Sequence, residues 1–412
     1  MTDRPVTQHP MTDRRALIIG GSIGGLCAAL LLRQAGWDVL VFERVGSPLD
    51  ARGAGIVTHP ELLRILERLG LDTVHDFGIA VEERVTLALD GGTVGTHRYP
   101  QLMTAWDRVF RMLRNALPDA CYMPDAELDG IDFTKDGVRA RFTDGRQAEG
   151  ALLVGADGVR SSVRRLLLPG VSPAYAGYVA WRGLLPEAAM PPMAHAALFH
   201  RFGFCLPPGE QMLGYPVAGE ANDLRPGHRR YNFVWYRPAD EATALPGLLT
   251  GTDGRLHALA IPPPLIRPEV TAAMRAAAHR TLAPAFAQVV QATPQPFLQP
   301  IYDLQSPRLA FGCAVLLGDA AFVVRPHVGA GVTKAAEDAA CLAAALAEAD
   351  SVPAALHRYE AERLHAGQRI VRRGRHLGAY LQAQRDTDEE RGAAARHDTA
   401  AAVMAETALL DF

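Results

Sequence analysis

The first forty-odd residues show two different patterns of apolar and polar positions. An unbroken apolar run at residues 16–19 predicts a buried strand, and the Ala- and Leu-rich residues 26–35 predict a helix that ends at Gly36. A second apolar run at residues 39–42 predicts another buried strand, which ends at Glu43. Two short buried strands joined by a helix are typical of a parallel βαβ unit.

The pattern changes in the middle of the chain. Between residues 175 and 296 aromatic residues and prolines become more frequent, and short apolar runs at 202–204, 211–216 and 231–236 predict antiparallel strands. A strongly apolar run at residues 310–317 then predicts one further buried strand. An antiparallel sheet domain is therefore predicted to interrupt the first domain.

Two Ala-rich stretches near the end of the chain, residues 332–349 and 354–384, predict long helices. We therefore predict an α/β fold with a Rossmann-like domain, an inserted, mainly antiparallel β-sheet domain and C-terminal helices. The predicted ranges are 1–174 for the first domain (with 1–13 disordered), 175–296 for the substrate-binding sheet domain, 297–385 for the return of the first domain with its long helices, and 386–412 for a helical tail.

The turn after the first strand carries the chemistry of dinucleotide binding. Gly20 permits a tight turn, and Gly25 lets the helix pack closely on the strand, so that free N–H groups at the helix start can attract a pyrophosphate. Glu43 follows Gly20 by 23 residues, where a carboxylate can accept hydrogen bonds from a ribose. The middle glycine of the usual motif is replaced by Ser22.

Composition narrows the class of protein. The 412 residues carry a formal net charge of −3 and no basic run, which argues against nucleic-acid binding. Five scattered cysteines suit reduced thiols, the histidines show no metal-ligand spacing, and no apolar run is long enough to span a membrane. We expect a cytoplasmic protein without a metal site. The sequence Met-Thr-Asp-Arg occurs at both 1–4 and 11–14, so translation from Met11 is an alternative.

Three motifs occur in order along the chain: Gly-Gly-Ser-Ile-Gly-Gly at 20–25, Gly-Ala-Asp-Gly at 155–158 and Gly-Asp-Ala-Ala at 318–321. Together they resemble the single-component FAD-dependent aromatic hydroxylases of the para-hydroxybenzoate hydroxylase family. The resemblance implies bound FAD and use of NADH or NADPH. The implied FAD-binding residues are Gly20, Ser22, Gly25, Glu43, Arg44, Arg52, Asp157, Gly158, Gly318, Asp319, Gly329, Ala330 and Gly331.

Motifs in the second half of the chain look like a narrower group. The segments Tyr-Ala-Gly-Tyr-Val-Ala-Trp-Arg-Gly at 175–183, Asn-Phe-Val-Trp-Tyr-Arg at 232–237 and Arg-Pro-His-Val-Gly-Ala-Gly at 325–331 resemble the 2,6-dihydroxypyridine 3-monooxygenase subgroup. Two positions depart from the broader family. Trp106 and Asp107 stand where an FAD-binding arginine usually begins a helix, and Phe322 replaces a histidine after Gly-Asp-Ala-Ala.

The implied reaction uses NAD(P)H, O₂ and a C4a-hydroperoxyflavin to hydroxylate a small aromatic ring. A histidine or tyrosine would help to deprotonate a ring hydroxyl near neutral pH. The catalytic candidates are His59 after the Arg52 loop, Tyr215 on a strand of the inserted sheet, and His327 in the loop around the flavin. The substrate-binding candidates are Tyr215, Arg325 and Pro326.

Each candidate also has a structural interpretation. His59 can simply precede a helix, Tyr215 can pack in the sheet, and Asp157 or Asp319 can cap a helix or form a turn. The aromatic side chains of Trp181, Trp235 and Tyr236 favour packing over contact with a substrate. Arg182 is open to both interpretations, because it could instead pair with a carboxylate in the sheet.

Several functions remain open on the sequence. The preferred one is hydroxylation of a hydroxypyridine-type ring; the alternatives are a carbocyclic phenol, a quinolone or a purine as substrate. A different class would be a flavin reductase or a flavin-binding protein without turnover. The resemblance implies a homodimer. The sequence leaves open the exact substrate, the position hydroxylated, the choice between NADH and NADPH, and the identity of the catalytic base.

Overall fold

The computed structural model describes residues 14–47, 55–135 and 137–409. The expectations for residues 1–13 and for Arg52 lie outside these ranges. Within them, a six-stranded, mostly parallel sheet has the order β16-β17-β10-β1-β2-β6. The strands are β1 Arg15–Ile19, β2 Asp38–Phe42, β6 Tyr122–Met123, β10 Leu152–Gly155, β16 Ala310–Phe311 and β17 Ala314–Leu316.

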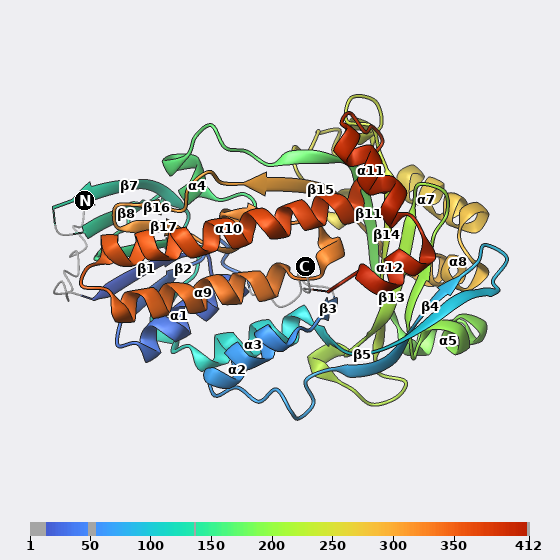
Figure 1. The fold of residues 1–412 in the computed structure, drawn as a ribbon, viewed down its shortest axis with the longest axis horizontal. Helices are drawn as coiled ribbons and strands as arrows, with labels where there is room; N and C mark the ends of the chain where they lie inside the picture. Colours follow the sequence, from blue (N-terminus) through green and yellow to red (C-terminus); the bar gives the residue numbers. More distant parts are fainter. Residues whose placement is uncertain (1–13, 48–54, 136, 410–412) are drawn as a thin grey trace.

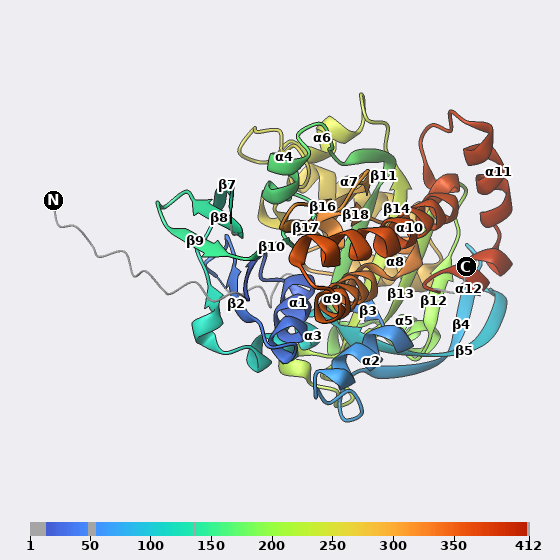
Figure 2. The same cartoon turned by 60° about the vertical axis from the view of Figure 1, so that its left-hand side comes forward.

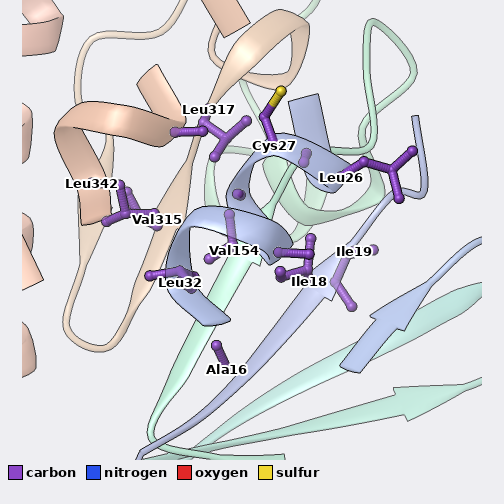
Figure 3. Packing of buried hydrophobic residues seen from close by; sticks show 14 of the residues in the cluster. Ala16, Ile18, Ile19, Leu26, Cys27, Leu32, Val154, Val315, Leu317 and Leu342 are labelled. Atoms are coloured by element: carbon purple, nitrogen blue, oxygen red, sulfur yellow. The ribbon is translucent and has the colours of Figure 1, made fainter. Parts of the chain in front are cut away.

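The parallel strands are apolar because both faces of the sheet are covered. Helices α1 (Ile23–Gln34) and α9 (Gly331–Glu348) pack against each other on one face, with the long α10 (Val352–Gly378) beside α9 (Figure 1). Figure 3 shows Ile18 and Val154 of the sheet in one apolar cluster with Leu32 and Leu342 of these helices, and all four side chains are completely buried.

A small antiparallel sheet adjoins the parallel one. It consists of β7 Leu128–Thr134, β8 Gly137–Phe142 and β9 Gln147–Gly150. Phe142 of this sheet stacks on Phe42 of β2, with ring centroids 4.5 Å apart. The chain then passes through β10 into the short helix α4 (Ser162–Leu167).

The second large layer is a nine-stranded sheet with the order β18-β15-β11-β14-β13-β12-β4-β5-β3. All its pairings are antiparallel except that of β12 with β4. Its strands are β3 Gly55–Val57, β4 Ile79–Leu87, β5 Thr93–Ala105, β11 Ala174–Pro186, β12 Phe202–Cys205, β13 Gln211–Val217, β14 Arg230–Pro238, β15 Phe297–Gln305 and β18 Phe322–Val323. Strands β3–β5, β15 and β18 belong to this sheet although they lie outside residues 175–296 in the sequence. The domain ranges given above stay a prediction.

Helices cover one face of this sheet and leave the other for the site. Helices α5 (Pro192–Leu198), α7 (Pro268–Thr281) and α8 (Pro284–Ala292) pack with the sheet in one apolar cluster. Helix α2 (Pro60–Arg68) packs beside α9, and α3 (Trp106–Ala116) follows β5 directly. The C-terminal helices α11 (Asp388–His397) and α12 (Ala400–Glu406) lie at the end of the molecule opposite β7–β9 (Figures 1 and 2).

The predicted α/β fold with its inserted antiparallel sheet is confirmed, but some predicted elements are wrong in detail. Residues 310–317 form a hairpin rather than one strand, because Gly312 turns the chain with φ +61°. Helix α1 begins at Ile23 rather than at residue 26, and α10 ends at Gly378 instead of continuing to 384. In the described part of the chain, no helix is both long and apolar enough for a transmembrane span.

Candidate active site

The turn between β1 and α1 is tight enough to require glycine at two positions. Gly20 has φ +108°, and its N–H donates to the carbonyl of Phe42 at 2.8 Å. A Cβ on Gly25 would lie 1.9 Å from the Gly20 carbonyl oxygen. Helix α1 therefore starts directly against the strand, and Ser22 caps it without a side-chain hydrogen bond. Its first N–H groups remain available to an anion.

Glu43 is held at the end of β2 by the same turn. The side chain is buried, and its two oxygens accept from the N–H groups of Gly21 at 2.8 Å and Val45 at 3.0 Å. A carboxylate can accept about four hydrogen bonds, so both oxygens keep capacity for ligand hydroxyls. Arg44 follows it on the cavity wall.

The three motifs surround one cavity of about 420 Å³ at the carboxyl ends of β1, β2, β10 and β17. In a doubly wound sheet this edge is where ligands bind. The predicted FAD-binding residues on its wall are Gly20, Ser22, Glu43, Arg44, Asp157, Gly158, Gly318, Asp319 and Gly331. The glycine cradle, the free helix N-terminus and the buried acceptor together fit the pyrophosphate and ribose of FAD.

Asp157 is engaged within the protein. Its carboxylate accepts from the Ser161 hydroxyl at 2.5 Å and from the N–H groups of Ser162 and Val163 at 2.6 and 3.1 Å. Desolvation raises the pKa of this carboxyl, while these donors oppose the shift. Asp157 thus binds the first N–H groups of α4, whose N-cap residue is Ser161, and closes the turn at Gly158, whose φ is +74°.

A buried charge cluster that the sequence prediction missed lies behind Asp319. The Lys334 ammonium is 3.9 Å from the carboxylate of Asp319 and 3.8 Å from that of Asp338, and its side chain is only 2% exposed. Asp338 also accepts from the Gly318 N–H at 2.9 Å and from Arg363 at 2.7 Å. The cluster holds the Gly318 turn in place. The i,i+4 pairing of Lys334 with Asp338 inside an Ala-rich helix is the signal that could have revealed it.

A second cavity of about 560 Å³ adjoins the first. The two cavities share the wall residues Trp106, Asp319, Gly331 and Val332. Strands β11, β13, β14 and β15 of the nine-stranded sheet form one side of the second cavity, and the loop 324–332 before and into α9 forms the other. Its further wall residues include Arg182, Phe202, Tyr215, Tyr236, Phe297, Gln299, Arg325, Pro326, Gly329, Ala330, Thr407 and Ala408.

Of the three catalytic candidates, Tyr215 alone is on the wall of this second cavity. Its ring meets the ring of Phe202 edge-on, with centroids 5.1 Å apart. Burial raises the pKa of Tyr215 to about 12, so the phenol stays protonated at neutral pH. It can donate a hydrogen bond to a ring oxygen and accept one in return. Tyr236, for which packing was favoured, also lines the cavity.

The two histidine candidates support the loop from behind. His327 is 2% exposed, and its Nε2 lies 2.8 Å from the Tyr178 hydroxyl. His59 immediately precedes α2, and its Nδ1 lies 3.1 Å from the hydroxyl of Thr333 at the start of α9. Neither residue is on the wall of either described cavity. Their position fits a structural role in holding the 324–332 loop.

The two arginines of the second cavity differ in whether a carboxylate neutralises their charge. Arg325 is buried and pairs with Asp303 at 2.8 Å, and it also donates to Gln382 at 2.8 Å. Arg182 donates to the neutral amide of Gln299 at 2.9 Å and makes no ion pair with any residue in the described ranges. The sequence left Arg182 between two interpretations, and its position on the cavity wall favours contact with a ligand.

Comparison with known proteins gives the class. The FAD binding domain family matches residues 13–202 and 271–374, and an FAD binding domain-like family matches residues 175–303. Because the first match covers more than half of the chain, the protein belongs to this flavoprotein family. It is an enzyme of the FAD-dependent aromatic monooxygenase class, as the sequence resemblance implied.

Individual relatives show which enzymes of this class the chain resembles. The chain is 33% identical to the 2,6-dihydroxypyridine 3-monooxygenase of Paenarthrobacter nicotinovorans over 375 residues, which cover 90% of this chain and 92% of that protein. It is 31% identical to the 3-amino-4-hydroxybenzoate 2-monooxygenase of Streptomyces cremeus, with 89% and 88% covered. The structure of 2,6-dihydroxypyridine-3-hydroxylase from Arthrobacter nicotinovorans superposes with a TM-score of 0.85 at 30% identity, covering 93% of this chain and 96% of that one.

Gly25→Ala is expected to lower FAD affinity by tenfold or more, which corresponds to ~1.4 kcal/mol or above. The added methyl group would lie 1.9 Å from the Gly20 carbonyl oxygen, so helix α1 must move away from the strand. Titration of apoprotein with FAD, followed by quenching of flavin fluorescence, measures the change. Gly170→Ala is the matched control, since its Cβ would meet nothing within 4 Å. An FAD affinity of Gly25→Ala equal to that of wild type would contradict this role of the close packing between Gly25 and Gly20.

His327→Gln is expected to reduce the acid sensitivity of the fold. Burial, aided by Arg325, lowers the pKa of His327 to about 3, whereas the unfolded chain takes up this proton near 6.5. Keeping His327 neutral therefore costs little folding free energy above pH 6.5. The free energy of unfolding then decreases as the pH falls from there toward 3. Between pH 7 and 5 the loss is about 2 kcal/mol. Urea unfolding at both pH values measures it, with exposed His75→Gln as control; an equal loss in wild type and His327→Gln would refute the assignment.

Proposed function

We propose that the protein is an FAD-dependent monooxygenase that hydroxylates a small, hydroxylated heteroaromatic ring of the hydroxypyridine type, using NADH or NADPH and O₂. The observation that carries the proposal is the contact between the two cavities. They share Trp106, Asp319, Gly331 and Val332, so a ring under the nine-stranded sheet would adjoin a flavin whose nucleotide part occupies the first cavity.

The first cavity would hold FAD through residues already described. The N-terminus of α1 would bind the pyrophosphate, Glu43 a ribose, and Asp319 the hydroxyls of the ribityl chain. Gly329, Ala330 and Gly331 line the second cavity, where backbone groups can approach a flat ring. When bound, FAD would accept a hydride from the nicotinamide and activate O₂ for transfer of one oxygen atom.

The residues of the second cavity would prepare the aromatic ring. A ring hydroxyl must lose its proton for the neighbouring carbon to become a good nucleophile. The Arg182 guanidinium, which no carboxylate of the described residues neutralises, would favour the ionised hydroxyl. The protonated Tyr215 would donate a hydrogen bond to the same oxygen or to a ring substituent. The apolar side chains of Phe202, Leu213 and Val234 would keep water away.

A hydroxylated benzoate is the second candidate substrate. An arginine can bind a carboxylate with two hydrogen bonds, and one relative acts, by its name, on 3-amino-4-hydroxybenzoate. Arg182 would suit such a group as well as an ionised hydroxyl. The homodimer, the cytoplasmic location and the choice of nicotinamide stay predictions.

A coupled assay tests the proposal. The FAD-loaded enzyme is supplied with NADH or NADPH and O₂, with and without 2,6-dihydroxypyridine, and H₂O₂ and product mass are followed. Expected are faster nicotinamide oxidation on addition of the ring, a product heavier by one oxygen atom, and little H₂O₂. Product only from a hydroxybenzoate would favour the second candidate. Oxidation that no aromatic compound accelerates would contradict the hydroxylase and favour a reductase.

Arg182→Gln is expected to lower kcat/KM for 2,6-dihydroxypyridine by roughly tenfold to a hundredfold, because a charge-assisted hydrogen bond contributes about 1.5–3 kcal/mol. The loss should be largest below the pKa of the ring hydroxyl, where the enzyme itself must favour ionisation. Steady-state kinetics across pH measures both effects. Tyr215→Phe is the matched control: it removes a neutral hydroxyl instead of a charge, so its loss of kcat/KM should depend less on pH than that of Arg182→Gln. Equal losses at every pH would contradict this role of Arg182.

A further inference from the structure

The end of the chain returns to the second cavity. After α12 ends at Glu406, Thr407 and Ala408 stand on the cavity wall. We call residues 404–408 the C-terminal strap. Helix α12 packs against β4 and β5 of the nine-stranded sheet, so the strap joins this sheet to the loop on the flavin side. The sequence predicted a helical tail here and assigned it no role in the site.

The strap docks on the loop that closes the flavin side of the cavity. The Ala408 N–H donates to the His327 carbonyl at 2.7 Å. Ala408 has φ +56°, which an alanine adopts only when its surroundings impose it. Its Cβ lies so close to Gly329 that a Cβ added there would be only 2.8 Å away. The strap and the loop therefore fit each other at one position.

Arg84 of β4 holds the other side of the strap. This arginine is completely buried, and its Nη1 donates to the carbonyls of Met404 at 2.6 Å and Thr407 at 2.9 Å. Its Nε and Nη2 both donate to the Gln101 side chain, at 3.1 and 2.6 Å. The acceptors include a carbonyl in the last turn of α12, where a cation is favourable.

The same guanidinium reaches a second part of the cavity wall. It lies 5.3 Å from the ring centroid of Phe202, which lines the cavity and contacts the ring of Tyr215. No carboxylate of the described residues pairs with Arg84. Burying an unpaired cation is expensive unless hydrogen bonds replace its hydration; here Nη1 bonds the strap, while Nε and Nη2 bond Gln101.

We propose that the C-terminal strap determines which ring size the cavity accepts, and that Arg84 is the positioning residue that holds it. The proposal goes beyond the proposed function and uses it only for the choice of ring. A fixed strap would restrict the cavity to a single ring and exclude water beside it. A released strap would admit larger rings. It would also let O₂ take up the two electrons of reduced flavin and form H₂O₂, with no hydroxylation of the ring.

Full-length, FAD-loaded Arg84→Met tests the proposal, since methionine fills similar space without donors. Expected is a rise of tenfold or more in the ratio of kcat/KM for 2-hydroxyquinoline to that for 2,6-dihydroxypyridine, with unchanged FAD affinity. Arg84→Lys, which keeps a donor for the two carbonyls, should restore most of the wild-type ratio. Arg98→Met, an exposed arginine on the neighbouring strand β5, is the matched control and should equal wild type.

Limited proteolysis supplies a readout that needs no turnover. Trypsin should release the peptides beginning at Gly392 and His397 several-fold faster in Arg84→Met than in wild type, and 2,6-dihydroxypyridine should slow this release in wild type. If no aromatic compound is turned over, faster release still supports the strap while the proposed function fails.

The proposal would be overturned if Arg84→Met had the wild-type ratio of kcat/KM values and the wild-type rate of peptide release. Equal changes in Arg98→Met would overturn it as well, because they would not depend on the strap. Should Arg84→Met fail to bind FAD or to fold, Ala408→Val replaces it: a β-branched side chain at φ +56° against Gly329 must unseat the strap. Ala408→Val with the wild-type ratio would likewise refute the proposal.

Discussion

The parallel alignment of β1, β10 and β17 is the constraint on which the site depends. Each of these strands is followed by one of the three motifs, so that segments about 300 positions apart in the chain meet at one sheet edge. The close packing of Gly25 on Gly20 then sets how near helix α1 comes to that edge. A Cβ at Gly20 would lie 2.4 Å from the Ala156 carbonyl oxygen and one at Gly25 only 1.9 Å from the Gly20 carbonyl oxygen, so either substitution would displace the turn and helix α1.

The second layer completes the site by facing this edge with a sheet. The loop 324–332 lies between the two layers and is supported by two buried contacts, that of His327 with Tyr178 and that of His59 with Thr333 at the start of α9. Charges near the loop are neutralised within the protein, as Arg325 is by Asp303. Arg182 differs among the charged residues of the cavity in facing it without such a partner in the described chain, which makes the cavity suited to an anionic ring.

The sequence predicted those features that local patterns encode. Buried strands, the glycine turn and Glu43 follow from apolar runs and spacing, and the resemblance supplied the cofactor. Helices α7 and α8 were missed although Pro268 and Pro284 mark their starts, because their Ala-rich faces show weak periodicity. The direction of a side chain within a loop has no sequence signal. The sequence therefore named His59 and His327 as catalytic candidates together with Tyr215, although only Tyr215 of the three lies on a wall of the two described cavities. The strap depends on contacts between distant residues, among them those of Arg84 with Met404 and Thr407, which are 320 and 323 positions away.

A spectral titration shows whether the flavin and an aromatic ring occupy adjoining cavities. The FAD-loaded enzyme is titrated with 2,6-dihydroxypyridine in the absence of any nicotinamide, and the visible absorbance of the oxidised flavin is recorded. We predict a saturable shift of the flavin bands, because a ring on the shared wall of the cavities changes the polarity around the flavin. Saturable binding measured by calorimetry with an unchanged flavin spectrum would contradict it, since the ring would then lie away from the flavin.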